Sequence, residues 1–192
     1  MSQGLKKFVI FITITFSIVL TNAYANTPRE NLVLAKMGDV DAQMALAQMY
    51  WYGKEIPKSN SEALYWYKEA AKQGNIEALN RIGNVYSIGL NDNNLALYWY
   101  DKAAKKGNSE AMNRIGMIYS DGNNGVKQDK KLAMEWFEKA YKGGDKHAPG
   151  NIGYAYFNGD GVTRDYDKAK YWYKEAAKRG NGLAEMRLRE DF

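Results

Sequence analysis

The sequence predicts an all-α protein, an α-solenoid of antiparallel helix pairs. One aromatic string that ends in glycine recurs along the 192 residues: residues 171–181 are nearly repeated at 65–75 and 98–108, and a more diverged copy spans 135–145. A glycine followed by Asn or Asp recurs at spacings of 36, 33, 37 and 36 residues, at Gly38, Gly74, Gly107, Gly144 and Gly180. Self-similarity at such a period is the signature of stacked repeat units.

Two helical patterns fill each unit, and we name them helix A and helix B in chain order. Helix A of the second unit carries Ala78, Ile82 and Val85 on one stripe of a 3.6-residue period. Helix B of that unit places Ala96 and Trp99 on one face. This alternation of small and large side chains suits the interlocking of adjacent helices.

A small residue lies beside the helix-A stripe in every unit, at Ala47, Gly83, Gly116 and Gly153. Glycine within a helix costs about 1 kcal/mol relative to alanine, so a periodic glycine requires a structural reason. We predict that a large aromatic side chain of helix B approaches the backbone of helix A there. The tryptophans of helix B fall at core spacing and are predicted to be buried: Trp66, Trp99, Trp136 and Trp172.

The two ends of the chain are expected to differ from the repeats. Residues 26–37 are assigned to an N-terminal capping helix and residues 182–192 to a C-terminal half-unit. The four units between them are assigned to residues 38–73, 74–106, 107–143 and 144–181. A solenoid needs such caps because its last units would otherwise expose an apolar face.

Residues 1–25 have the pattern of a secretory signal peptide. Lys6 and Lys7 precede an uncharged apolar run of 13 residues, and Ala23 and Ala25 supply the small residues of a cleavage site. A membrane-spanning helix needs about 20 apolar residues, so a retained anchor is the less favoured alternative. We predict cleavage after Ala25, no membrane span in the mature chain, and a periplasmic location, with an extracellular location as the alternative.

Charge and cysteine content exclude several classes of partner and site. Removal of Lys6 and Lys7 lowers the formal net charge from +5 to +3. Nucleic-acid binding favours a clustered basic face, whereas the basic residues here are spread along the helices, so nucleic acid is not an expected partner. The chain has no cysteine, which excludes disulfides, thiolate metal sites and an acylated cysteine.

The motif Ala-x-x-x-[Ile/Leu]-[Gly/Ala]-x-x-Tyr-x-x-Gly, followed by Gly-Val-x-x-Asp-x-x-Lys-Ala-x-x-Trp, resembles the Sel1-like repeat family, relatives of tetratricopeptide repeats. The fourth unit fits best, through Tyr156, Gly161, Val162 and Trp172, whereas the second unit lacks the Gly-Val-x-x-Asp segment. The resemblance implies a right-handed α-solenoid that binds other proteins or, in exported bacterial members, envelope components. It implies no catalytic residues, and the absence of cysteine separates the chain from a cysteine-rich branch of exported relatives.

The residues offer little for catalysis or metal binding. His147 is the single histidine, so neither a zinc site nor a Ser–His–Asp arrangement is expected. Asp160 and Asp165 lie in a repeat loop, where they are better explained as turn formers than as a glycosidase pair. We predict no catalytic, cofactor-binding or metal-binding residue and no cofactor.

Helix A is expected to line the concave side of the solenoid, so its positions away from the buried stripe should bind a partner protein. Exposed aromatics beside adaptable polar groups are typical of binding surfaces. The predicted binding residues are Met44, Gln48 and Trp51; Asn80, Asn84 and Ser87; Asn113, Met117 and Ser120; and Tyr154 and Phe157. For the aromatics at the two ends, burial beneath the caps is the alternative.

These observations favour an exported, monomeric, non-enzymatic protein that binds another protein through helix A. One specific version is an immunity-type inhibitor of a toxic enzyme delivered to the envelope, and another is an adaptor in envelope assembly or host interaction. A cell-wall-active hydrolase is the alternative from a different class. It would need a cleft with convergent ionisable groups, which the sequence does not show.

Overall fold

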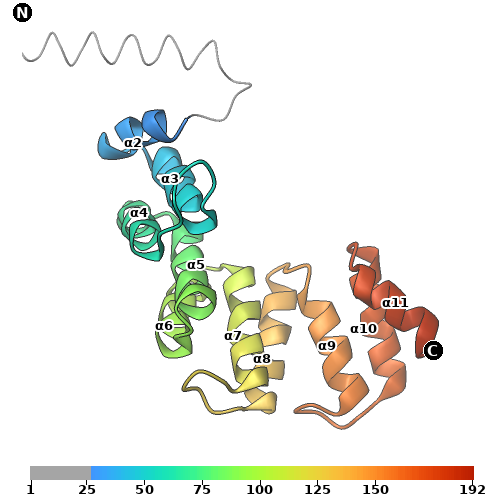
Figure 1. Ribbon diagram of the computed structural model, residues 1–192. Coiled ribbons are helices and arrows are strands. Elements are labelled where there is room, and N and C mark those ends of the chain that lie inside the picture. Colours follow the sequence, from blue (N-terminus) through green and yellow to red (C-terminus); the bar gives the residue numbers. More distant parts are fainter. Residues whose placement is uncertain (1–26) are drawn as a thin grey trace, which may run out of the picture.

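The structure is a computed structural model that describes residues 27–192, so the expected signal peptide lies outside the described residues. These residues form ten α-helices and one π-helical turn, with no strand among them. The prediction of an all-α solenoid is therefore confirmed. The helices follow one another in a bent row from α2 to α11 (Figure 1). Within residues 27–192, every helix is too short or too polar to span a lipid bilayer.

Four helix pairs form the body of the molecule. Helix A of each pair is α3 (Val40–Tyr52), α5 (Ile76–Asn84) with the π-turn η1 (Val85–Gly89), α7 (Ser109–Asp121) and α9 (Ala148–Asn158). Helix B of each pair is α4 (Asn60–Lys72), α6 (Asn93–Ala104), α8 (Lys130–Lys142) and α10 (Tyr166–Lys178). Single helices lie at the two ends, α2 (Pro28–Lys36) and α11 (Gly182–Glu190).

The repeated Gly-[Asn/Asp] motif sets the boundary between one unit and the next. Gly74, with φ of +90°, follows α4 in a left-handed conformation that residues with a side chain rarely adopt. The side chain of the next residue, Asn75, then accepts a hydrogen bond from the backbone N–H of Ala78 and caps α5. The same cap recurs at the start of α3, α7 and α11.

Helix A and helix B meet at the predicted glycine positions. A Cβ atom built at Gly83 would lie 2.4 Å from Tyr100 Cε1, and one built at Gly116 would lie 2.6 Å from Phe137 Cδ1. The corresponding distance from Gly153 to Tyr173 Cδ1 is 2.9 Å. The predicted approach of a helix-B aromatic to the helix-A backbone is thus confirmed.

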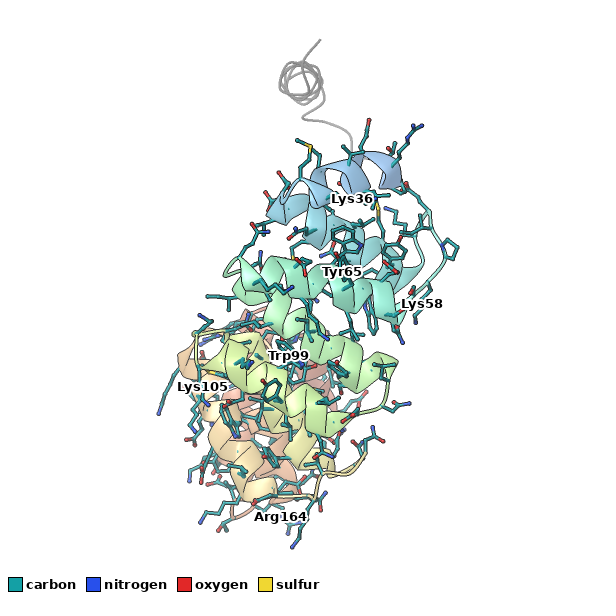
Figure 2. The ribbon with its side chains drawn as sticks, turned by 90° about the vertical axis from the view of Figure 1, so that its left-hand side faces the viewer. Lys36, Lys58, Tyr65, Trp99, Lys105 and Arg164 are labelled. Carbon is teal, nitrogen blue, oxygen red and sulfur yellow. The ribbon has the colours of Figure 1, made fainter. Side chains whose placement is uncertain are left out.

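The tryptophans of helix B lie between units rather than deep in the core. Trp66 is buried as predicted, whereas Trp99, Trp136 and Trp172 are half-buried. Trp99 packs against two core clusters, and the ring of Tyr98 covers part of it in a T-shaped contact at 5.4 Å. Figure 2 shows Trp99 and Tyr65 on the side of the molecule formed by α4 and α6. The predicted burial is therefore complete for Trp66, whereas the other three indoles pack against a core cluster and remain partly exposed.

The loops from helix A to helix B share one backbone hydrogen bond. The N–H of the residue that caps helix B donates to the carbonyl of a helix-A tyrosine at 2.8–2.9 Å, in the pairs Ser59–Tyr50, Asp92–Tyr86, Asp129–Tyr119 and Asp165–Tyr156. The second unit closes this bond with the shortest connection, and its helix A ends in η1 rather than in a left-handed glycine. The π-turn thus accommodates the shorter loop.

Candidate functional site

The helix-A positions predicted to bind a partner differ widely in exposure. Tyr154 is 50% exposed, Met117 is 38% exposed, and Gln48 is exposed as well. The remaining members are partly buried or buried: Met44, Trp51, Ser87, Ser120 and Phe157 are partly buried, and Asn80, Asn84 and Asn113 are buried. The expectation that the three amides lie on the surface was therefore wrong.

Asn84 is buried because Tyr100 reaches it from helix B. The Tyr100 hydroxyl donates a hydrogen bond to Asn84 Oδ1 at 2.7 Å. Since Gly83 has no side chain, the Tyr100 ring crosses helix A beside it and brings its hydroxyl to the far side. Burial also raises the pKa of Tyr100 above its usual value. The buried Asn84 side chain therefore links α5 to α6 through this hydrogen bond.

Asn113 is covered by a contact with the next unit, and Asn80 is buried without a side-chain hydrogen bond in the described part of the chain. The Asn151 side-chain amide donates to Asn113 Oδ1 at 2.8 Å and so links α9 to α7. Asn80 occupies the equivalent position in α5 and is fully buried. Neither polar atom of its side chain has a hydrogen-bond partner within residues 27–192. Asn113 therefore takes part in the contact between α7 and α9.

The end aromatics have different environments. Trp51 lies against the π-turn of the next unit, where a Cβ atom built at Gly89 would be 2.6 Å from Trp51 Cζ3. It is half-buried by the second unit, whereas the alternative had placed it under the N-terminal cap. The ring of Phe157 lies 6.0 Å from that of Phe192, so the C-terminal segment covers it as the alternative stated. Tyr154 stays exposed.

Three hollows share Met117 and form one groove over α7, which we name the helix-A groove. Their volumes are about 240, 300 and 490 Å³. Ile88, which is 61% exposed, lines the first hollow, Tyr154 lines the second, and Arg114 lines the third beside Met117. The groove thus combines large apolar side chains with amide and charged groups.

Sequence patterns missed two residues of this groove, Ile88 and Asn151. Ile88 lies within η1, where the wider helical turn changes the direction of each side chain relative to a 3.6-residue period. Asn151 occupies the position that Arg81 and Arg114 hold in the preceding units. The sequence could have indicated Asn151, because it occupies the same position in its unit as these two arginines.

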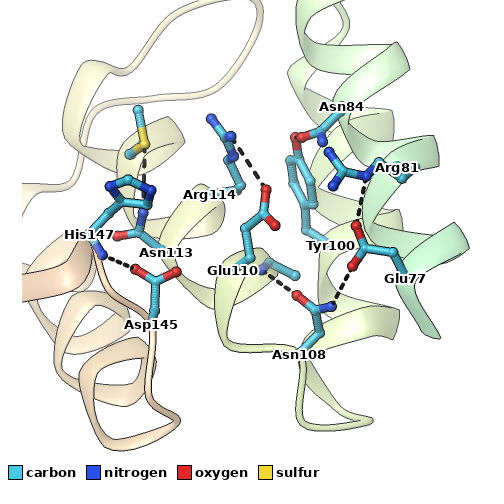
Figure 3. Close-up of polar contacts among 12 residues, drawn as sticks. Glu77, Arg81, Asn84, Tyr100, Asn108, Glu110, Asn113, Arg114, Asp145 and His147 are labelled. Carbon is cyan, nitrogen blue, oxygen red and sulfur yellow. Dashed lines mark hydrogen bonds and ion pairs between the residues drawn. The ribbon is translucent and has the colours of Figure 1, made fainter. Parts of the chain in front are cut away.

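A row of alternating charges runs along one edge of the groove (Figure 3). Arg81 Nε lies 2.6 Å from Glu77 Oε1, and Arg114 Nη2 lies 3.4 Å from Glu110 Oε1. Although burial opposes its charged form, the carboxylates of Glu77 and Glu110 raise the pKa of Arg81. Arg81 therefore interacts with a carboxylate of the next unit as well as with its own.

A separate hollow of about 460 Å³ lies between α2 and α3, near the other end of the row of helices. Gln48, Met49 and Tyr52 line it, and Tyr52 is 67% exposed. Gln48 is the one predicted binding residue that lines this hollow between α2 and α3. The predicted surface therefore divides into two separate concavities.

The polar groups around the groove include the residues that cap α9. The backbone N–H of His147, which is exposed, donates to Asp145 Oδ1 at 2.9 Å, as part of the cap of α9. Among residues 27–192, no three His, Asp or Glu side chains are grouped so that they could hold a metal ion. The groove offers hydrogen bonds and apolar contacts to a ligand.

The sequence matches the model of the Sel1 repeat in four consecutive segments, at residues 40–75, 76–108, 109–145 and 150–181. Together they cover most of the chain. No curated protein matches the sequence.

Solved structures of repeat proteins are similar to this chain. A protective antigen of uropathogenic Escherichia coli strains that displays an SLR fold is 37% identical, with a TM-score of 0.72 over 84% of this chain and 35% of that chain. A Sel1 repeat protein from Oxalobacter formigenes is 35% identical, with a TM-score of 0.73 over 84% of this chain and 65% of that chain. This chain therefore spans about a third of the length of the Escherichia coli antigen and about two thirds of the length of the Oxalobacter formigenes protein. Cysteine rich protein B of Helicobacter pylori, at 21% identity and a TM-score of 0.54, covering 68% of this chain and 96% of its own, shares the fold.

Proposed function

The chain belongs to the Sel1 repeat family, and on that premise we propose that it acts as a monomer that binds another protein through the helix-A groove. Sel1 repeats typically mediate protein–protein interactions. The observation that carries the proposal is the exposure of Ile88, Met117 and Tyr154 beside three connected hollows. Large apolar side chains exposed in a concavity and surrounded by polar groups are typical of binding surfaces.

The polar network beneath the groove supports a binding role. Asn84 bonds Tyr100, and Asn113 bonds Asn151, so these side chains fix the positions of the helices. A surface that is already held in place loses little conformational freedom when a partner binds. The groove is therefore suited to a preformed contact.

Capture of the partner from an envelope extract tests the proposal. The purified chain serves as bait, and the double variant Met117→Glu/Tyr154→Ala removes two of the three exposed apolar groups of the groove without changing a buried residue. The expected result is recovery of a partner by the unaltered chain and its loss with the variant. The matched control is Tyr98→Ala/Tyr171→Ala, which removes two similarly exposed side chains from helix B, 53% and 56% exposed. Equal recovery by the groove variant, with circular dichroism unchanged, would contradict the proposal.

We propose that the protein is exported and that its first 25 residues are removed. The support is the charged start, the apolar run and the small residues Ala23 and Ala25. Cell fractionation followed by N-terminal sequencing should find a mature chain in the periplasm that begins at Asn26. A cytoplasmic chain that retains these residues would contradict this proposal and leave the binding proposal intact.

Within the envelope, we propose an inhibitory role of the immunity type, in which the groove covers a toxic enzyme. The support is that the groove offers contacts to a protein surface while its polar side chains hold the helices together. The captured partner should lose its activity when the chain is added in molar excess, and Met117→Glu/Tyr154→Ala should restore it. A partner that stays active while bound would instead identify an adaptor in envelope assembly or host interaction.

A further inference from the structure

The charge row along the helix-A groove changes sign at the fourth unit. Glu77 and Glu110 occupy equivalent positions at the start of α5 and α7, each four residues before an arginine. The equivalent position at the start of α9 is His147, and Lys146 precedes it. A basic pair thus stands where the preceding units carry an acidic residue.

Arg114 is consequently the last arginine of the row, and its ion-pair partner within residues 27–192 is Glu110 of its own unit. Arg81 interacts with Glu110 across the unit boundary, and with its own Glu77 at 2.6 Å. Arg114 pairs with Glu110 at 3.4 Å, a longer contact than that of Arg81 with Glu77. Figure 3 shows Arg114 between Glu110 and the segment that carries His147.

The largest hollow of the helix-A groove, of about 490 Å³, opens at this end of the row. Hydrogen-bond donors line it from α7 and from the starts of α9 and α11: Arg114, Lys146, His147, Asn151 and Asn181. A guanidinium and an ammonium attract a carboxylate, and amide or imidazole N–H groups bond to its remaining lone pairs. These donors complement an acidic group, and the lining also includes the carboxylates of Glu110, which pairs with Arg114, and Asp145.

The carboxylate of Asp145 also borders this hollow, and it is engaged in the helix cap. Asp145 is 6% exposed, and its Oδ1 accepts hydrogen bonds from the backbone N–H groups of His147 at 2.9 Å and Ala148 at 2.7 Å. Its charge is stabilised by the start of α9. Asp145 is therefore occupied by the start of α9, while Arg114 makes one long contact to Glu110, which also lines the hollow.

We propose that this hollow binds an Asp or Glu side chain of the partner protein, next to an apolar partner residue that packs on Met117. The guanidinium of Arg114 makes the principal contact, since its planar fork matches a carboxylate. Lys146 adds a positive charge from the start of α9. The inference rests on the proposed function and names the chemistry that the groove selects.

A pair of short peptides tests the acidic preference directly. N-acetyl-Leu-Glu-Leu-amide and its Glu→Gln counterpart are titrated into the full mature chain, and backbone amide shifts are followed by NMR. We expect the Glu peptide to shift the amides of Lys146, His147 and Asn151 and to bind about tenfold more tightly than the Gln peptide, as charge-assisted hydrogen bonds require. Equal binding of the two peptides, or no shift with either, would overturn the proposal.

The variant His147→Glu supplies the acidic residue that the row lacks and provides the second test. It should lower the affinity of the Glu peptide to that of the Gln peptide, while the melting temperature stays equal or rises because Arg114 gains a partner. Lys174→Glu on α10, an exposed position outside the groove, is the control and should leave binding unchanged. A Glu peptide that keeps its advantage in His147→Glu would overturn the assignment. The two proposals can fail separately. Equal binding of the two peptides would overturn the acidic preference, whereas loss of the natural partner in Met117→Glu/Tyr154→Ala would still support the proposed function.

Discussion

Tyr100 lies against the backbone of Gly83, where a Cβ atom would be 2.4 Å from its ring, and its hydroxyl donates to Asn84 on the far side of the same helix. Phe137 on Gly116 and Tyr173 on Gly153 repeat the first part of this contact. Each such pair fixes how closely helix A and helix B approach within a unit. The position of the groove floor therefore depends on these glycines.

Gly83→Ala should destabilise the fold by about 1–3 kcal/mol, the usual cost of overpacking a core. Helix propensity favours alanine by about 1 kcal/mol, but the buried ring of Tyr100, which is 1% exposed, would have to shift to admit the added methyl group. Urea unfolding followed by circular dichroism measures the change. Gly182→Ala is the control, because a Cβ atom there meets nothing within 4 Å, and it should be neutral or stabilising.

Asn84→Ala should cost about 1–3 kcal/mol, because it leaves the buried Tyr100 hydroxyl without its acceptor. Asn80→Ala removes the same atoms from a buried amide that has no hydrogen-bond partner in residues 27–192, so its cost should be smaller. The difference between the two free energies of unfolding isolates the hydrogen bond. Equal costs would contradict a stabilising role for the Tyr100–Asn84 pair.

The fold should lose stability in alkali between about pH 10 and pH 12. Burial raises the pKa of Tyr173 to about 12, and burial also raises the pKa of Tyr67. An unfolded tyrosine titrates near pH 10, so stability is fully present below that pH and falls as the unfolded chain releases its protons first. Denaturation midpoints across this range should fall less steeply in Tyr173→Phe than in the unaltered chain. Tyr98→Phe, at an exposed site, should show the same slope as the unaltered chain.

Phe192→Ala should lower stability by about 1 kcal/mol and increase the exposure of Phe157. The Phe192 ring lies 6.0 Å from that of Phe157 and 6.2 Å from that of Tyr173, so it covers the end of the last complete unit. Thermal unfolding measures the change. Leu183→Ala is the comparison, because Leu183 is 62% exposed on α11 and its removal should have an effect within about 0.5 kcal/mol.

The repeat pattern was sufficient to predict the helix pairs and the aromatic contact at Gly83. These features depend on a local rule that each unit obeys separately, so they can be read from the spacing of small and large residues. The packing of Trp99 between units was harder to predict, because the spacing places an indole on the buried side without saying how far the next unit extends over it.

The burial of the amides and the path of η1 could not be predicted in the same way. A helical wheel places Asn84 opposite the buried stripe, but it takes no account of a tyrosine ring that crosses a glycine. It likewise omits the contact from Asn151 that covers Asn113. Ile88 became exposed because the second unit closes its short loop with a π-turn, which breaks the period on which the assignment depended.

A hydrogen bond closes each loop, such as that from the Asp129 N–H to the Tyr119 carbonyl at 2.8 Å. Because of this bond, extra residues in the loop need not alter the packing of the helices. Both ends of the connection are held at one point, so additional chain between them forms an outward excursion and leaves the helices in register. In the equivalent loop between α3 and α4, the exposed tip at Glu55 is consequently a grafting position, where a foreign epitope or a spectroscopic label can be spliced into the protein while the remainder keeps its shape.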